Sequence, residues 1–552
     1  MSTTEVLSAP GFLARERTVA RPGFSRWLVP PAALAIHLCI GMAYGFSVFW
    51  LPLSKAIGIT ESVECPAGIS FVGRLMSTTC DWKLYMLGWT YTLFFVFLGS
   101  AAAIWGGWLE RAGPRKAGVV AAICWCGGLV ISAGGVVLHQ LWMLWLGSGV
   151  IGGIGLGLGY ISPVSTLIKW FPDRRGMATG MAIMGFGGGA MIGAPLADRL
   201  MKFYATPASV GVWETFLTLA VIYFVFMMAG ALSYRVPPDG WRPAKWDPSQ
   251  VKAKKLVTDR HVHLSVAWRT PQFWLLWGVL TLNVSAGIGI LGMASPLLQE
   301  VFGGRLIGVS ATIDQLTGAQ KAQIAAIAAG FTGLLSLFNI GGRIFWASLS
   351  DRLGRKTTYT IFFLLGIGLY SSIPWTAATA NLALFVAFFC VALSMYGGGF
   401  ATVPAYLADL FGTRMVGAIH GRLLTAWSTA GVLGPVLVNY IRDYQLDHGV
   451  PRAQAYSLTM FILAGLLALG FVCNLLIKPV NPKNFMTPLQ IAADDKAEKA
   501  KNGGQQPAAA PVTSGVGEAQ TSWLVPAAWL AVWIPLGWGI WVTLQKAVLL
   551  FK

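Results

Sequence analysis

The stretch ERAGPRK at residues 110–116 returns as DRLGRK at residues 351–356, so that the two acidic residues lie 241 positions apart. Other landmarks repeat at almost the same interval: Pro163 and Pro404 at 241 residues, and at 240 residues Phe171 and Phe411, Arg174 and Arg414, and Pro195 and Pro435. A constant offset over separate landmarks indicates an internal repeat. The chain is therefore predicted to consist of two similar halves that have the same orientation.

Long apolar runs fill the sequence between these landmarks. Of the 552 residues, 55% are hydrophobic and only 11% are charged. Runs of about 18 residues or more can cross the ~30 Å apolar core of a bilayer as helices. Twelve such spans are predicted at about 27–53, 84–109, 117–138, 142–168, 177–200, 213–234, 273–298, 324–349, 359–377, 382–408, 416–440 and 456–477. The alternation typical of β-barrel strands is absent, so the fold class is an all-α polytopic membrane protein.

Positive charge is concentrated in alternate connections between the spans. The net charge is +18, and the basic clusters fall at 111–116, 169–175, 235–269 and 352–356, whereas the connections between them are nearly neutral. Basic loops stay in the cytoplasm, so both ends of the twelve-span region are placed there. The distribution of positive charge therefore indicates a protein embedded in a lipid bilayer, and not one that binds nucleic acid. No removable signal peptide is expected before the first span.

Composition divides the chain into six parts. They are a cytoplasmic tail (1–26), a six-helix half (27–234), a cytoplasmic linker (235–270), a second six-helix half (271–478), a cytoplasmic linker expected to be disordered (479–521), and an additional transmembrane helix (522–552). The last segment is apolar and rich in Trp, and its polar face would be almost empty. Spanning is therefore favoured over a helix lying in the membrane interface.

Two of the seven cysteines fall in the connection between the first two spans. Cys65 and Cys80 lie on the outer side by the charge rule, where an oxidising compartment would allow a disulfide between them. The other five lie in apolar runs and are interpreted as packing residues. They have no companion ligands, so no metal site is predicted.

Arg343 is the most informative single residue. It lies inside an apolar span, eight residues before Asp351 at the basic boundary, which corresponds to roughly 12 Å at about 1.5 Å per residue. A permanent cation at that depth costs about 2.5–3.5 kcal/mol or more, so it should face a polar cavity or a partner. No acidic residue precedes it within two turns of its helix; the residue four positions back is Asn339. The missing partner is therefore predicted to be an anion that binds and leaves.

The repeated charged motif predicts a cytoplasmic latch. Its first copy comprises Gly106, Glu110, Arg111 and Arg115, and its second comprises Asp351, Arg352 and Arg355, with Ala347 in place of the glycine. An acidic residue near the N-terminus of the next span, or near the facing arginines, would hold two helices together.

These motifs, with twelve spans in two halves, resemble the major facilitator superfamily. Within it, KWFPDRRG (169–176), RTPQFW (269–274) and LFNIGGRIFW (337–346) resemble the oxalate/formate antiporter family, which is related to the monocarboxylate transporters. The resemblance covers about residues 25–480. It implies the major facilitator fold, with two six-helix halves related by pseudo-two-fold symmetry, to which this chain adds a C-terminal transmembrane helix.

The resemblance also implies a binding site between the halves. Arg343 falls where the antiporters hold a substrate carboxylate, whereas Trp427 falls where they have a lysine. One cation suits a monoanion better than a dianion. The aromatic wall of the cavity would be Tyr44, Tyr160, Phe186, Tyr396 and Phe400, and Asn339 stands where a monocarboxylate transporter can have a proton-carrying acid. Proton coupling would therefore need His37, His420 or the carboxyl group of the substrate itself.

We therefore expect a secondary transporter of small carboxylate anions in a bacterial inner membrane, which exchanges one carboxylate for another. The alternative is a proton-coupled monocarboxylate symporter. A membrane sensor that recruits a partner through the last helix is a further alternative. No phosphate-binding loop, nucleophile–base pair or cofactor motif is found, so neither an enzyme nor a cofactor is expected. The protein is expected to be a monomer, to which a partner could bind through the C-terminal helix.

Overall fold

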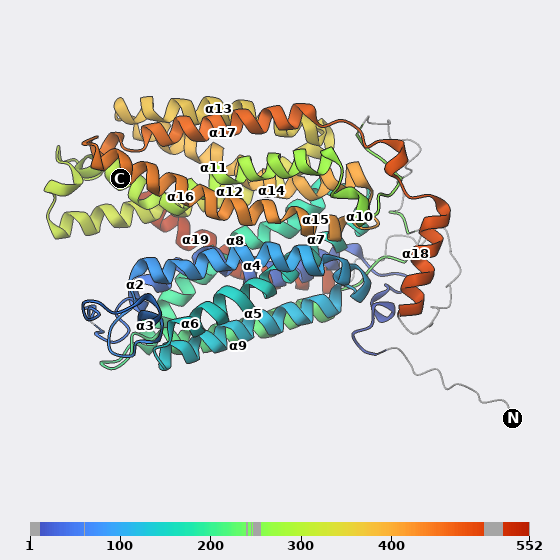
Figure 1. Ribbon diagram of the computed structural model, residues 1–552, viewed down its shortest axis with the longest axis horizontal. Coiled ribbons are helices and arrows are strands. Elements are labelled where there is room, and N and C mark those ends of the chain that lie inside the picture. Colours follow the sequence, from blue (N-terminus) through green and yellow to red (C-terminus); the bar gives the residue numbers. More distant parts are fainter. Residues whose placement is uncertain are drawn as a thin grey trace.

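The computed structural model describes residues 11–59, 61–238, 241–243, 246, 256–501 and 523–550. Over these residues the chain has 13 helical segments that are long and apolar enough to cross a membrane, as predicted, and no β-strand. Figure 1 shows two bundles of helices that lie side by side along the long axis, one from each half of the sequence. The protein is a multi-pass membrane protein.

The first half contains six membrane-length segments. The first segment is made of α1 (Val29–Ile40), a 3-10 turn (Gly41–Phe49) and α2 (Trp50–Leu53). It is followed by α4 (Leu84–Ala112), α5 (Pro114–Val137), α6 (Leu141–Leu144) with a π-helical stretch (Trp145–Gly152) and α7 (Gly153–Trp170), α8 (Arg175–Tyr204) and α9 (Val212–Ser233). The short helix α3 (Phe71–Met76) lies in the connection between the first two segments.

The second half repeats this plan. Its segments are α11 (Pro271–Phe302), α12 (Gly318–Leu353), α13 (Arg355–Ala378), α14 (Leu382–Phe411), α15 (Val416–Leu423) with α16 (Thr425–Asp447), and α17 (Ser457–Leu476). The short helix α10 (Leu264–Ala267) precedes them in the central linker. The predicted spans fall within these segments to a few residues at each end, because sequence hydropathy marks the apolar core and not the last polar turns.

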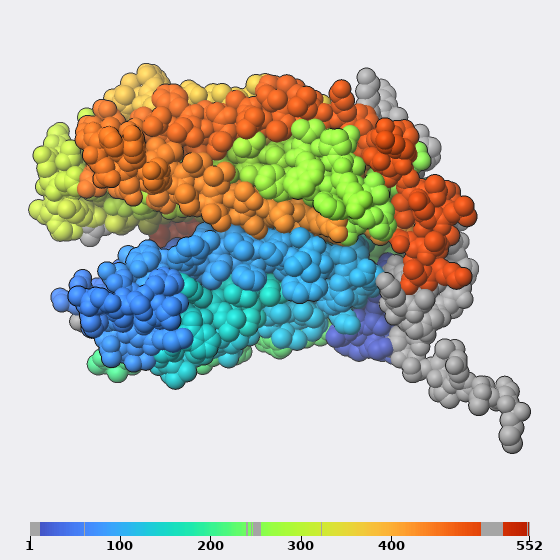
Figure 2. Space-filling view, in the orientation of Figure 1, coloured from blue at the N-terminus to red at the C-terminus, as the bar shows by residue number. Residues whose placement is uncertain are grey.

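Several helix contacts join the halves. Helix α8 packs against α12, and α4 packs against α15 and α16. Figure 2 shows the two halves parted toward the end that carries α3 and in contact toward the end that carries α10. The halves are therefore closed at the end that carries α10. The charge pattern predicts that this end faces the cytoplasm; it is called the cytoplasmic end below, and the opposite end is called the outer end.

The irregular turn in the first segment follows from a close helix contact. A Cβ atom added at Gly41 would lie 2.3 Å from the carbonyl oxygen of Phe186, so only glycine allows the chain to approach α8 so closely. The 3-10 turn that begins at Gly41 carries Tyr44 to the same interface. The sequence predicted one continuous span at 27–53 and did not reveal this 3-10 turn.

The connection between α2 and α4 is cross-linked. Cys65 and Cys80 form a disulfide. The neighbouring Asp81 carboxylate accepts hydrogen bonds from the backbone N–H groups of Ile57 and Gly58 at 2.7 and 3.1 Å, and from that of Val63 at 2.9 Å. Together these contacts fold the connection at the outer end of the first half.

The prediction of disorder after the twelfth span is wrong for residues 482–501. Residues Pro488–Lys501 form α18, which Thr487 and Gln490 begin with reciprocal hydrogen bonds of 3.2 and 2.9 Å between side chain and backbone. The segment is tied to the second half, because Asp495 pairs with Arg414 at 2.5 Å. The polar composition that suggested disorder belongs to a solvated helix, and residues 502–521 lie outside the described residues.

Candidate functional site

Arg343 lies on α12 at the interface between the halves, and only 1% of it is exposed. Its Nη1 donates to the carbonyl oxygen of Ile183 on α8 at 2.8 Å, and its Nε donates to Oδ1 of Asn339 at 3.2 Å. The second terminal nitrogen, Nη2, has no hydrogen-bond partner among the described residues. No carboxylate pairs with this guanidinium in the described part of the chain, so no negative charge there balances its own.

Aromatic rings from both halves lie against the guanidinium. The Cζ atom is 6.0 Å from the ring centre of Phe186 on α8 and 5.8 Å from that of Phe400 on α14. These distances are within the range of cation–π attraction. The cation is thus held between one ring of each half.

Trp427 on α16 is the centre of the aromatic cluster. Its ring centre lies 5.2 Å from Phe186 and 4.6 Å from Phe400, and 5.1 Å from Tyr160 on α7. The structure also places Phe95 of α4 at 5.6 Å from this indole. Nothing in the sequence distinguished Phe95 from the other apolar residues of its span.

Two tyrosines connect the halves beside this cluster. The hydroxyl groups of Tyr44 and Tyr396 lie 3.1 Å apart, and each can donate to the other. Tyr44 also packs edge-on against Phe186, with 4.9 Å between ring centres. The structure therefore brings together the whole predicted set: Arg343, Asn339, Tyr44, Tyr160, Phe186, Tyr396, Phe400 and Trp427.

Three donors in this cluster have no acceptor among the described residues. They are Nη2 of Arg343, the Tyr160 hydroxyl and Nε1 of Trp427. A buried donor without an acceptor costs about 1–3 kcal/mol. The guanidinium and the indole can only donate, so the group that would complement these donors is one that accepts hydrogen bonds, and a negatively charged acceptor complements them best.

The two predicted proton sites have different surroundings. His37 is fully buried, and its ring nitrogens face two backbone carbonyl oxygens, that of Ala182 and that of Tyr160, the latter at 3.1 Å. It thereby ties α1 to α7 and α8. His420 on α15 is also buried, 5.9 Å from the Tyr160 ring, and neither of its nitrogens has a partner among the described residues.

The acidic residues of the repeated motif cap helices of the opposite half. Glu110 accepts from the backbone N–H of Gly417 at 2.9 Å, at the start of α15, and pairs with Lys169 at 2.7 Å. Asp351 accepts from the backbone N–H groups of Gly176 and Met177 at 2.8 and 2.9 Å, at the start of α8. Of the two predicted partners, the N-terminus of the next span is wrong as the capped helix, because each carboxylate caps a helix across the interface. An arginine partner is found for Asp351, which pairs with Arg355 at 2.6 Å.

The arginines of the two motif copies also differ. Arg355 pairs with Asp351 at 2.6 Å and with Asp409 at 3.2 Å, and Asp409 pairs with Arg175 of the first half at 3.1 Å. By contrast, Arg115 donates to the carbonyl oxygen of Phe12 at 3.0 Å and has no ion pair with Glu110. Arg111 and Arg352 are exposed. The second copy thus forms the larger charged network.

Close packing of two helices explains why the first copy of the motif has a glycine, Gly106. A Cβ atom at Gly106 would lie 3.1 Å from Cα of Ala418, so α4 and α15 touch there. In the second copy, the close contact is allowed by a glycine on the partner helix, Gly176. A Cβ atom there would lie 2.1 Å from the carbonyl oxygen of Ala347. The pairing of α8 with α12 therefore tolerates alanine at position 347.

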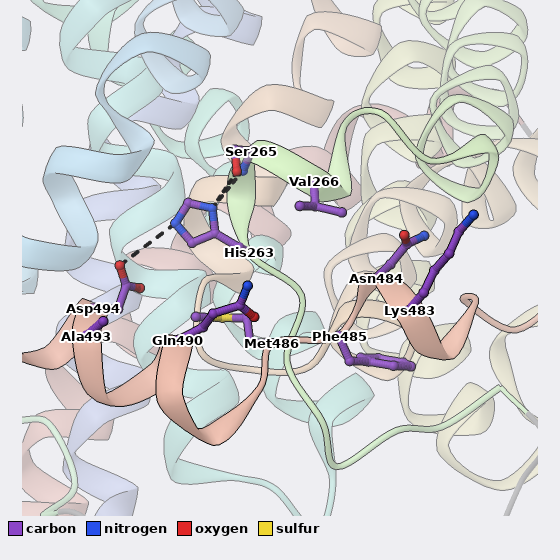
Figure 3. A pocket seen from close by; sticks show the side chains of 10 residues that line it. All are labelled: His263, Ser265, Val266, Lys483, Asn484, Phe485, Met486, Gln490, Ala493 and Asp494. Carbon is purple, nitrogen blue, oxygen red and sulfur yellow. Dashed lines mark hydrogen bonds and ion pairs between the residues drawn. The ribbon is translucent and has the colours of Figure 1, made fainter.

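A separate cleft of 390 Å³ lies at the cytoplasmic end, between the central linker and α18. Figure 3 shows His263 and Asp494 on one side of it, with 3.9 Å between Nε2 and Oδ1. The residues that line this cleft do not include Arg343 or the aromatic cluster. It is therefore not part of the predicted site.

Comparisons with known proteins agree with the fold. The oxalate:formate antiporter of Oxalobacter formigenes is 30% identical to this chain over 286 residues. The match covers 51% of this chain and 59% of the antiporter. The apicoplast pyruvate carrier 1 of Toxoplasma gondii is 28% identical over 53% of this chain and 58% of its own length. This chain thus spans less than two thirds of either relative.

Solved structures show the same arrangement of helices. The human organic anion transporter MFSD10 (TETRAN) has a TM-score of 0.56 at 15% identity, over 82% of this chain and 100% of that one. The transporter FucP in the outward conformation has a TM-score of 0.53 at 12% identity, over 81% and 99%. The sequence profile of the Major Facilitator Superfamily matches residues 33–435. This chain belongs to the Major Facilitator Superfamily.

Proposed function

We propose that this transporter carries small carboxylate anions by alternating access, and that it exchanges one carboxylate for another as oxalate/formate antiport does. The observation that carries the proposal is the buried guanidinium of Arg343, which has a terminal nitrogen without an acceptor and no paired carboxylate among the described residues. A guanidinium presents a planar fork that matches the two oxygens of a carboxylate.

The surroundings of Arg343 also support a small anion. The Tyr160 hydroxyl and the Trp427 indole add two donors, while Phe186 and Phe400 provide apolar faces. Apolar side chains with a few converging polar groups are typical of small-molecule sites. Closing the halves over the site buries the guanidinium, and burying a cation costs more free energy without an anion beside it than with one. A bound carboxylate therefore favours closure. This favours exchange, in which the return step also carries an anion.

The second candidate function is proton-coupled symport of monocarboxylates. It is favoured by Trp427, which leaves one cation in the site, and by the buried histidines His37 and His420. We propose that the protein works as a monomer in a bacterial inner membrane in either case.

A counter-flow assay in proteoliposomes separates the two candidates. Vesicles preloaded with a carboxylate are expected to take up the labelled acid at least about ten times faster than empty vesicles, because the loaded site returns more readily. The lumen is expected to keep its pH during exchange. Uptake that is equal in empty vesicles and that acidifies the lumen would reject exchange and support symport.

The charge of the site predicts its preference. Trp427→Lys adds a second cation, so affinity for oxalate and malonate is expected to rise relative to that for formate and acetate, by about tenfold. Trp427→Met removes the ring without adding charge and serves as the control. A preference that moves toward the monocarboxylates in the lysine variant would reject the argument from charge.

A further inference from the structure

The thirteenth helix, α19 (Leu524–Ala547), lies along the seam between the two halves. It contacts α12 of the second half and both α8 and α1 of the first half. One apolar cluster joins all four helices: Leu34, Met184, Met191, Ile340, Val532 and Leu536. In Figure 1, α19 appears behind the line where the bundles meet. The helix is therefore not an isolated anchor.

Its contacts with the second half are close helix-to-helix contacts. A Cβ atom at Gly330 of α12 would lie 2.2 Å from the carbonyl oxygen of Lys546, and one at Gly333 would lie 2.9 Å from Cγ2 of Thr543. Close backbone approach through glycine is what holds helices together in a membrane, since lipid is as apolar as the helix surface. The C-terminal part of α19 is thus packed tightly onto α12.

Its contacts with the first half run along much of the helix, from Trp529 near the cytoplasmic end to Trp538, whose ring centre lies 5.1 Å from Cζ of Arg199 toward the far end of α8. They include one close approach, at Gly539, where an added Cβ would lie 3.1 Å from the carbonyl oxygen of Met191. Nε1 of Trp529 donates to the carbonyl oxygen of Trp27 at 3.1 Å, just before α1. Farther along, Leu536 packs over Gly188 of α8, where an added Cβ would lie 3.0 Å from its Cδ1. The next residue back along α8, Gly187, lies against the Arg343 guanidinium, since an added Cβ would be 3.0 Å from Nε. This contact therefore lies directly behind the site.

We propose that α19 moves with the second half and acts as a strap that holds the first half against it when the cytoplasmic end is closed. Opening that end must separate the start of α8 from the end of α12, where Asp351 now caps α8. The same motion carries α1 and α8 away from Val532 and Leu536. The strap therefore stabilises the cytoplasm-closed state, and it does so whichever substrate is carried.

The test uses the full-length chain and needs no substrate. Spin labels are placed at Lys116 and Thr357, which are exposed and are the third residues of α5 and α13. Each position is replaced by an amino acid with a ketone side chain, to which the spin label is attached. The distance between the labels reports opening of the cytoplasmic end. A failed transport assay would count against the proposed function, whereas this distance tests only the strap.

Val532→Ala with Leu536→Ala is expected to raise the population of the open cytoplasmic end by about threefold or more, because packing across the seam is lost. The matched control is Leu530→Ala with Ile534→Ala on the same helix, whose side chains are 59% and 69% exposed. The control should leave the label distances unchanged. Equal populations in both variants would overturn the proposal.

Two cross-links test which half α19 follows. Cysteines at Gly333 and Thr543 would have Cβ atoms 3.8 Å apart, which suits a disulfide; this cross-link should leave opening intact. Cysteines at Ile192 and Gly539, where an added Cβ lies 3.1 Å from Cγ1 of Ile192, should on oxidation trap the closed state. Free opening with the second cross-link, or a block by the first, would overturn the assignment of α19 to the second half.

Discussion

The Arg343→Ala variant is expected to lose carboxylate exchange in proteoliposomes by roughly a hundredfold or more, because a charge-assisted hydrogen bond to a carboxylate contributes about 1.5–3 kcal/mol and the guanidinium can form two. The bonds of Arg343 to Ile183 and Asn339 leave its Nη2 for an anion. Its removal takes away the sole cation among the clustered site residues. Exchange is measured as uptake of labelled acid into preloaded vesicles.

Arg343→Lys should lose most of this activity as well, since an ammonium keeps the charge but cannot form the planar pair with two oxygens. Arg422→Ala is the matched control. Its guanidinium also bonds a backbone carbonyl, that of Leu264 at 3.2 Å, and lies 5.6 Å from an aromatic ring, that of Trp268, but it lies outside the cluster. Full exchange in Arg343→Ala, or an equal loss in the control, would reject the site.

Loss of the cytoplasmic latch is expected to have the second largest effect. Asp351→Ala removes the acceptor for two backbone N–H groups of α8 and one partner of Arg355. A helix cap contributes about 0.5–2 kcal/mol, so the cytoplasm-closed population should fall by about tenfold relative to the open one. The rate of exchange should fall with it, because each cycle must pass through the closed state.

The distance between labels at Lys116 and Thr357 measures this shift as well. Asp198→Ala is the matched control, since Asp198 pairs with Lys202 at 2.7 Å at the far end of the same helix α8 and is half exposed. That variant should keep the original distribution of distances. An unchanged distribution in Asp351→Ala would show that the cap across the halves does not hold the closed state.

Much of the fold could be predicted because it rests on features that are local in sequence. The number of spans follows from the length of the apolar runs, and the likeness of the halves follows from the interval between Glu110 and Asp351. The membership of the aromatic cluster was predicted from the resemblance to a family, with each residue carried by its place in a span. The charge of Arg343 alone indicated that something must neutralise it.

What could not be predicted depends on contacts between distant segments. Arg343 bonds the carbonyl oxygen of Ile183, and backbone acceptors on another helix leave no mark in the sequence. Glu110 caps α15 at Gly417, 307 residues away, where the sequence suggested the next span or the facing arginines. Helix α18 was missed because its composition is polar, although Thr487 and Gln490 form a capping pair. The place of α19 along the seam likewise depends on glycines in other helices.

The most direct test of the central claim is equilibrium binding to the purified full-length protein, with acetate, formate, lactate, oxalate and malonate titrated one at a time against the original chain and Arg343→Ala. If a carboxylate neutralises the buried guanidinium, at least one of these acids stabilises the original chain against heat, and none stabilises the variant. An acid that stabilises both proteins equally, or a panel that stabilises neither while both stay folded, would contradict this account.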